Sequence, residues 1–202
     1  ARDRGPATYH RRSMSRRLLL LIAFVEGFAS LGIEITALRR LVPHLGSSIT
    51  ITAPTIGLFL VALALGYRSG GRVGGDFLAR VLANFLLAAL IAGIGLSPWA
   101  GQLFFAAGNN VVAGYLLFMV AVVCPAAWLL AQTVPLISNL VQAERPGEAS
   151  GQVLAASTGG SVIGASLLPL LVMPQWGVSA AGGICARAMG SSRIQSGTGA
   201  AA

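Results

Sequence analysis

The sequence has no lysine, few acidic residues and only two cysteines among its 202 residues. All 14 basic residues are therefore arginine, which we attribute to genomic base composition rather than to chemistry, and only 10% of the chain is charged. With 55% hydrophobic residues, this scarcity of charge fits a polytopic helical membrane protein much better than a soluble domain. Cys124 and Cys185 form neither a metal-ligand spacing nor a disulfide framework. We therefore expect no metal site.

The net charge of +8 is concentrated outside the apolar segments. Nucleic-acid-binding surfaces combine basic residues with interleaved aromatic residues, and this sequence contains no such pattern. Anionic lipid headgroups account for the arginines more simply, so we expect a lipid partner and no nucleic acid. The sequence also lacks an evident catalytic nucleophile and a cofactor-binding loop. We therefore expect neither a cofactor nor catalysis by this chain.

Five apolar segments are long enough to cross a bilayer as helices. We predict an all-α membrane bundle of about five transmembrane helices within residues 18–175, preceded by a basic segment at residues 1–17. Arginines are frequent in residues 1–17 and again in residues 68–80. The positive-inside rule places both stretches, and hence the N-terminus, in the cytoplasm, with the bundle in a bacterial inner membrane and the far end outside. The predicted spans are 18–41, 49–67, 81–96, 111–130 and 152–173.

The last segment, residues 176–202, differs in composition from the rest of the chain. It is rich in glycine, serine and alanine, its apolar run is too short to span a bilayer, and it shows no clear periodicity. We expect a flexible tail, or a non-native or truncated end.

The first apolar segment carries ionisable residues at unusual depth. Glu26, Ser30 and Glu34 form one slowly turning stripe, because successive helical residues rotate by ~100°. Carboxylates at such depth need a partner or a wet cavity, so we expect the stripe to face protein. Arg39 is offset by roughly 140° from Glu34 and cannot pair with it along the helix. These four residues make up the candidate intramembrane polar site.

Two interpretations of this polar site remain open. In the functional one, a carboxylate binds a proton or a cation such as a polyamine ammonium group in the low dielectric of the bundle. In the structural one, each carboxylate is satisfied within the protein: Glu34 pairs with Arg39 or Arg40 across a break in the helix, or with Arg68, and Glu26 accepts hydrogen bonds from hydroxyl groups or is protonated.

Small residues recur at four-residue intervals on two of the later helices. Such ridges allow a second helix to approach closely in a membrane. A polar break follows the fourth span. It is either a discontinuous helix that lines a cavity or a plain kink, and both interpretations remain open. The ridges are Ala62, Gly66 and Gly70 in the second span and Ala156, Gly160 and Gly164 in the fifth; the break contains Gln132, Thr133 and Pro135.

The first helix also resembles a known family. Its GFASL run at residues 27–31, followed by Glu34 and Arg39, is similar to the first-helix pattern of the membrane domain of spermidine synthase-like proteins, which fuse a major-facilitator-like region to a polyamine aminopropyltransferase. Ile33 replaces the aromatic residue of that pattern. The same family has patterns similar to GLFLVALALGYRSGGRV at residues 57–73, AQTVPLIS at 131–138, and GQVLAASTGGSVIGASLLPLLVMPQWG at 151–177.

The resemblance implies a function for the membrane bundle. No Rossmann-like strand and glycine-rich turn for the aminopropyltransferase half occurs in these residues. We therefore expect an integral membrane anchor or scaffold subunit that packs with a partner membrane complex or a catalytic domain. The alternative is a transporter-like module for polyamines or another small cation, which would use the Glu26 to Glu34 stripe.

Overall fold

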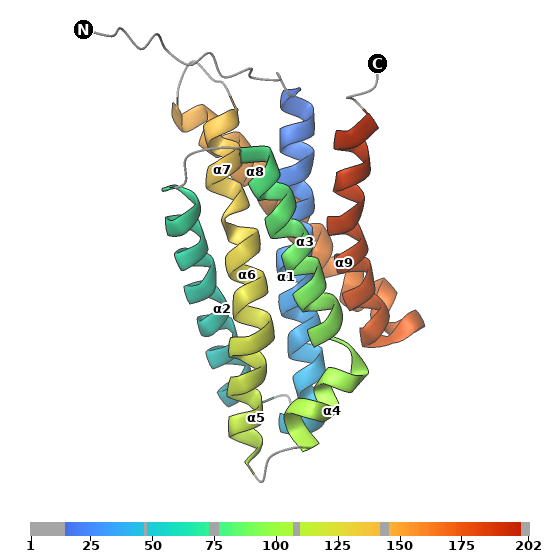
Figure 1. Ribbon diagram of the computed structural model, residues 1–202. Helices are drawn as coiled ribbons and strands as arrows, with labels where there is room; N and C mark the ends of the chain where they lie inside the picture. The colour runs from blue at the N-terminus through green and yellow to red at the C-terminus, as the bar shows by residue number, and fades with distance from the viewer. Residues whose placement is uncertain (1–14, 47, 73–76, 107–109, 142–145, 199–202) are drawn as a thin grey trace, which may run out of the picture.

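The computed structural model describes residues 15–46, 48–72, 77–106, 110–141 and 146–198, and in these ranges all regular structure is helical. The predicted all-α class is confirmed. Figure 1 shows the bundle with the central helix α1, which packs against α6, α8 and α9. The elements are α1 (Arg16–Leu45), α2 (Ile49–Gly70), α3 (Phe77–Gly95), α4 (Pro98–Ala106), α5 (Val111–Phe118), η1 (Met119–Val123), α6 (Cys124–Ala131), α7 (Thr133–Leu140), α8 (Pro146–Leu167), η2 (Leu168–Val172) and α9 (Met173–Thr198).

Five helical stretches within the described ranges are long and apolar enough to cross a membrane. Many of their large apolar side chains point outward, as lipid-facing residues do; Leu60 and Leu90, for example, are more than half exposed. The chain is thus an integral membrane protein built on about five spans. The stretches are Arg16–Leu45, Ile49–Gly70, Leu78–Gly95, Val111–Leu140 and Gly147–Val178.

The ends of α1 follow from local chemistry. The Ser15 side chain accepts a hydrogen bond from the Leu18 N–H, which caps the first turn. The helix then continues four residues beyond the end of the predicted span at residue 41. Pro43 lies inside the last turn, where it has no N–H to donate to the Arg39 carbonyl, and the Gly46 N–H donates to the Val42 carbonyl with Gly46 at a φ of 76°.

Prolines coincide with the two π-helical turns. The turn η1 directly precedes Pro125, and the Cys124 N–H donates to the Met119 carbonyl five residues back. The turn η2 contains Pro169, and the Met173 N–H donates to the Leu168 carbonyl in the same way. A proline cannot donate to the carbonyl four residues before it, so the wider turn replaces a regular one at each position.

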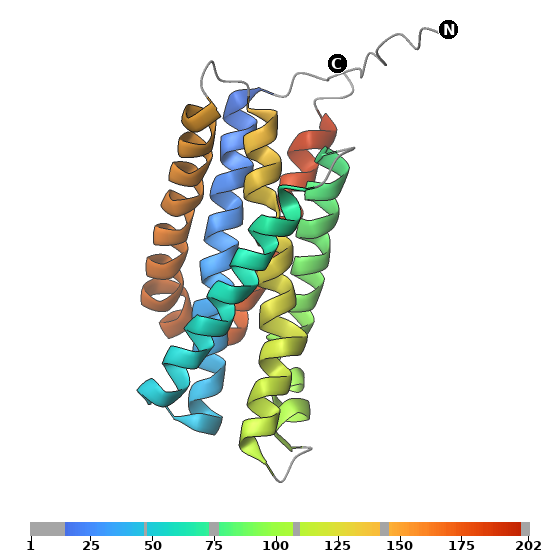
Figure 2. The same ribbon diagram turned by 90° about the vertical axis from the view of Figure 1, so that its left-hand side faces the viewer.

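The C-terminal part of the described chain is helical, which differs from the flexible tail predicted for residues 176–202. At Gly177 the chain reverses with a φ of 80°, and α9 packs back against α1 and α3. Ala181, Cys185 and Met189, spaced by four, are buried on its inner face. Figures 1 and 2 place the start of α1 and the end of α9 at the same end of the bundle, called here the N-terminal end.

Residues 1–14, which include most of the predicted basic segment, lie outside the described residues. The same holds for residues 73–76 of the arginine-rich loop and for 199–202. The predictions made for those positions stay predictions.

Candidate functional site: the intramembrane polar stripe

The three polar residues predicted to form a stripe on α1 are all buried. Glu26, Ser30 and Glu34 have exposed fractions of 1%, 6% and 6%. The stripe therefore faces protein rather than lipid. Arg39, the fourth residue of the candidate site, is exposed and does not join it.

Glu26 has a defined partner on α8. The Ser157 hydroxyl donates to Glu26 Oε2 at 2.7 Å, and both groups are buried. One turn further along α8, the Ser161 hydroxyl donates to the Gly27 carbonyl at 3.1 Å. Two serines thus join α8 to α1 through a carboxylate and a backbone carbonyl.

The backbones of α1 and α8 approach each other closely at these hydrogen bonds. A Cβ atom built on Gly160 would overlap the Phe24 carbonyl oxygen, and one built on Gly164 would lie 2.5 Å from the Phe28 carbonyl oxygen. On the opposite helix, a Cβ on Gly27 would overlap the Ser157 carbonyl oxygen. Figure 2 shows α8 running beside α1 along this contact, called here the α1–α8 seam. The seam has no room for a methyl group at these three glycines.

The other small-residue ridge packs on the fourth span. A Cβ on Gly66 would lie 2.5 Å from the Ala131 Cβ, and one on Gly70 would lie 2.6 Å from the Gln132 carbonyl oxygen. Ala62, the first residue of this ridge, is buried, whereas Ala156, the first residue of the α8 ridge, is half-buried. Glycines rather than alanines therefore mark the closest helix approaches.

Glu34 differs from Glu26 in its surroundings. It forms no hydrogen bond or ion pair with any residue in the described part of the chain. The structural pairing of Glu34 with Arg39, Arg40 or Arg68 is absent there too. Arg40 instead donates from Nε to the Leu96 carbonyl at 3.1 Å, just after the end of α3. An arginine at this position neutralises the partial negative charge of a helix C-terminus.

The polar break after the fourth span is a short interruption between α6 and α7. Gln132 separates the two helices and keeps near-helical dihedral angles, φ −62° and ψ −23°. Its Oε1 atom accepts a hydrogen bond from Asn84 of α3 at 3.4 Å. Its Nε2 atom and the Thr133 hydroxyl are buried and have no hydrogen-bond partner among the described residues. The interruption is thus one residue long and lies within a continuous apolar stretch, Val111–Leu140.

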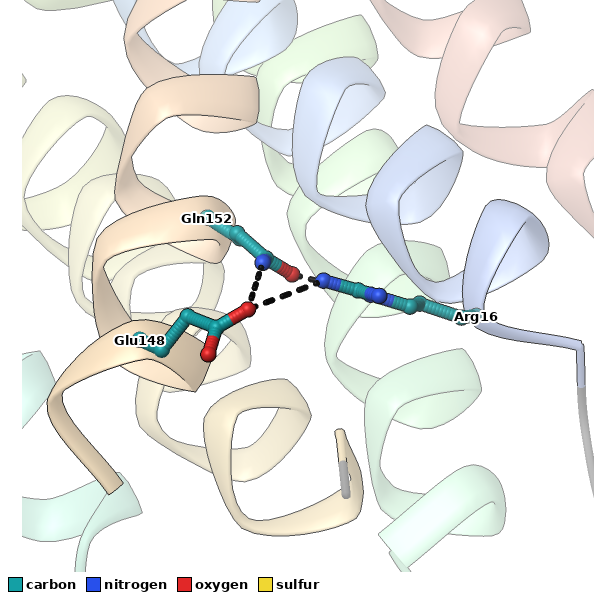
Figure 3. Close-up of polar contacts among 3 residues, drawn as sticks. All are labelled: Arg16, Glu148 and Gln152. Carbon is teal, nitrogen blue, oxygen red and sulfur yellow. Dashed lines mark hydrogen bonds and ion pairs between the residues drawn. The ribbon is translucent and has the colours of Figure 1, made fainter. Parts of the chain in front are cut away.

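A second α1–α8 contact, at the N-terminal end, was not predicted from the sequence. Figure 3 shows Arg16, Glu148 and Gln152 together: Arg16 Nε donates to Gln152 Oε1 at 2.9 Å, and Arg16 Nη2 lies 3.6 Å from Glu148 Oε1. Gln152 also donates to Glu148 at 2.9 Å. The four-residue spacing of Glu148 and Gln152 was a usable signal, because such residues share one helix face.

Metal binding finds no support in the part of the chain that the structure describes, where no three His, Cys, Asp or Glu side chains cluster. Comparison with known proteins identifies no relative: no family model, no curated protein and no solved structure matches this chain. The resemblance to spermidine synthase-like membrane domains therefore stays a hypothesis.

Proposed function

We propose that this chain is an integral membrane scaffold or anchor whose buried polar groups hold its helices together. The observation that carries this proposal is the α1–α8 seam. Glu26, the less exposed of the two stripe glutamates, is hydrogen-bonded to Ser157 where the two helices leave no room for a methyl group. A polyamine molecule is much larger than a methyl group, so a polyamine bound there would have to separate the two helices.

The partner is the second part of the proposal. The resemblance to the membrane half of spermidine synthase-like proteins supports a partner that is either another membrane complex or an aminopropyltransferase-like catalytic domain. In this proposal the chain itself is not an enzyme. The N-terminal end faces the cytoplasm of a bacterial inner membrane, as the arginine distribution supports.

The scaffold proposal is tested by purification from native membranes in a mild detergent. We expect the chain to elute with a partner, at a mass well above the 20.7 kDa of one copy. In the double variant Gly160→Leu/Gly164→Leu, the helix bundle should not form and the partner should no longer co-elute. Gly151→Leu, at a glycine with open space around it, should keep both the bundle and the partner. A wild-type chain that is strictly monomeric and free of partners contradicts the proposal.

A second function, transport of a polyamine or another small cation, is favoured by one observation. Glu34 is 6% exposed, and no described residue pairs with its carboxylate. A buried carboxylate without a protein partner is a natural site for a cation inside a membrane.

This second function predicts that spermidine raises the melting temperature of the purified protein and is taken up by vesicles containing it. Both effects should disappear in Glu34→Gln. The matched control is Glu148→Gln, because Glu148 is an exposed carboxylate at the N-terminal end. Unchanged uptake in Glu34→Gln rejects transport through this residue.

A further inference from the structure

Three arginines of the N-terminal end lie on three different helices and share one property. Arg17 on α1, Arg68 on α2 and Arg80 on α3 are all exposed, and none forms an ion pair with a described residue. Figure 1 shows that the start of α1, the end of α2 and the start of α3 lie at this same end of the bundle. These three residues are called here the arginine rim.

Each arginine of the rim lies on a lipid-facing helix surface. Arg17 is four residues from Leu21, which is 45% exposed, and Arg68 is three residues from Leu65, which is 55% exposed. Arg80 is seven residues, or about two turns, from the exposed Leu87. Residues at these spacings share a helix face, so each guanidinium lies beyond an apolar side chain that contacts lipid tails. Arg16, in contrast, is held by α8.

Among the described residues at this end of the bundle, the charge is unbalanced. Glu148 is the acidic residue described there, and Arg16 already pairs with it. The rim therefore presents guanidinium groups that form no ion pair with a described residue, at the depth where a spanning helix leaves the hydrocarbon region. A guanidinium donates two parallel hydrogen bonds to a phosphate, and anionic headgroups attract each arginine near the membrane surface.

We propose that the arginine rim binds the phosphate groups of anionic phospholipids in the surrounding leaflet. The lipid-facing position favours a headgroup over an acidic protein surface, because the same helix faces are occupied by acyl chains. The rim retains anionic lipid at the N-terminal end in preference to zwitterionic lipid. The proposal is independent of whether the bundle is a scaffold or a transporter.

The test is a lipid titration of the full chain in neutral detergent, followed by native mass spectrometry. We expect phosphatidylglycerol to bind more tightly than phosphatidylcholine, and the triple variant Arg17→Gln/Arg68→Gln/Arg80→Gln to weaken phosphatidylglycerol binding by about tenfold or more. Arg39→Gln is the matched control, since Arg39 is an exposed arginine near the other end of α1. It should leave binding unchanged.

Circular dichroism establishes that the triple variant keeps its helical content. The single variant Arg68→Gln should also weaken phosphatidylglycerol binding, by less than the triple variant does. A folded triple variant that binds phosphatidylglycerol as wild type does overturns the proposal. So does an equal loss in Arg39→Gln. Displacement of the lipid by soluble glycerol phosphate would identify a free-phosphate site and would overturn the lipid assignment.

Discussion

The α1–α8 seam makes a sharp prediction at two adjacent glycines of α8. In Gly160→Ala the added Cβ would overlap the Phe24 carbonyl oxygen and lie 2.8 Å from the Phe24 carbonyl carbon. In Gly159→Ala the nearest atom would be Phe24 Cε2 at 4.0 Å, an ordinary van der Waals contact. Both substitutions gain the same helix propensity, about 1 kcal/mol. The difference between the two variants therefore isolates the cost of forcing the helices apart.

That difference should be about 1–3 kcal/mol, the usual cost of overpacking a closely packed interior. The neighbouring atoms are backbone, which cannot rotate away as the end of a side chain can, so the helices themselves must separate. We expect Gly160→Ala to be destabilised and Gly159→Ala to be neutral or slightly stabilised.

The measurement is the free energy of unfolding of each purified variant, from titration with sodium dodecyl sulfate in mixed micelles and followed by circular dichroism. Gly164→Ala should behave like Gly160→Ala, because its Cβ would lie 2.5 Å from the Phe28 carbonyl oxygen. Equal stability of the Gly159 and Gly160 variants would show that α1 and α8 are not in close contact, and the seam would have to be abandoned.

Three further predictions use the same bundle. Ser157→Ala removes the hydrogen bond to Glu26 and should lower the free energy of unfolding by about 1–3 kcal/mol, and a stability equal to that of wild type would show that Glu26 does not depend on it. Thr133→Val replaces a buried hydroxyl that has no described partner and should stabilise the protein by about 1 kcal/mol; a loss of stability in the same titration would reveal a hydrogen bond to that hydroxyl. The last prediction uses a chain without its native cysteines, into which Ser15→Cys or Thr198→Cys is introduced. Both new cysteines should react with an impermeant maleimide from the same side of a vesicle. Labelling from opposite sides would contradict the reversal at Gly177.

The class and spans of the bundle were predictable because hydrophobic length is a strong, local signal in a membrane protein. The packing of α9 back against α1 and α3 was not predictable, because the inner face of α9 is built from small or weakly apolar residues. Ala181 and Cys185 are buried, but they occur among glycine, serine and alanine residues, where a four-residue period is hard to distinguish from low complexity. The reversal itself depends on one glycine, Gly177, in a conformation that few other residues adopt.

The polar contacts between helices were less predictable than the helices themselves. Helical periodicity places Glu26 and Glu34 on the same stripe, but the register of α8 against α1 decides which carboxylate meets Ser157. That register is set by three glycines packed against backbone carbonyl groups, and one sequence gives no direct information about it. For the same reason the sequence did not predict the contact of Arg16 with Glu148 and Gln152, although the four-residue spacing of Glu148 and Gln152 places them on one helix face.

The structure also changes the relative roles of the two buried glutamates. The family resemblance favoured Glu34 together with Arg39, yet Arg39 is exposed and Glu34 has no partner among the described residues. Glu26 is the one placed in the tightest helix contact, where a serine hydroxyl can hydrogen-bond to it in either protonation state. A buried polar group inside a membrane stabilises a bundle only when its hydrogen bonds are made. Glu26 meets that condition in the α1–α8 seam. We therefore propose that Glu26 stabilises helix packing and that the alternative cation site would use Glu34.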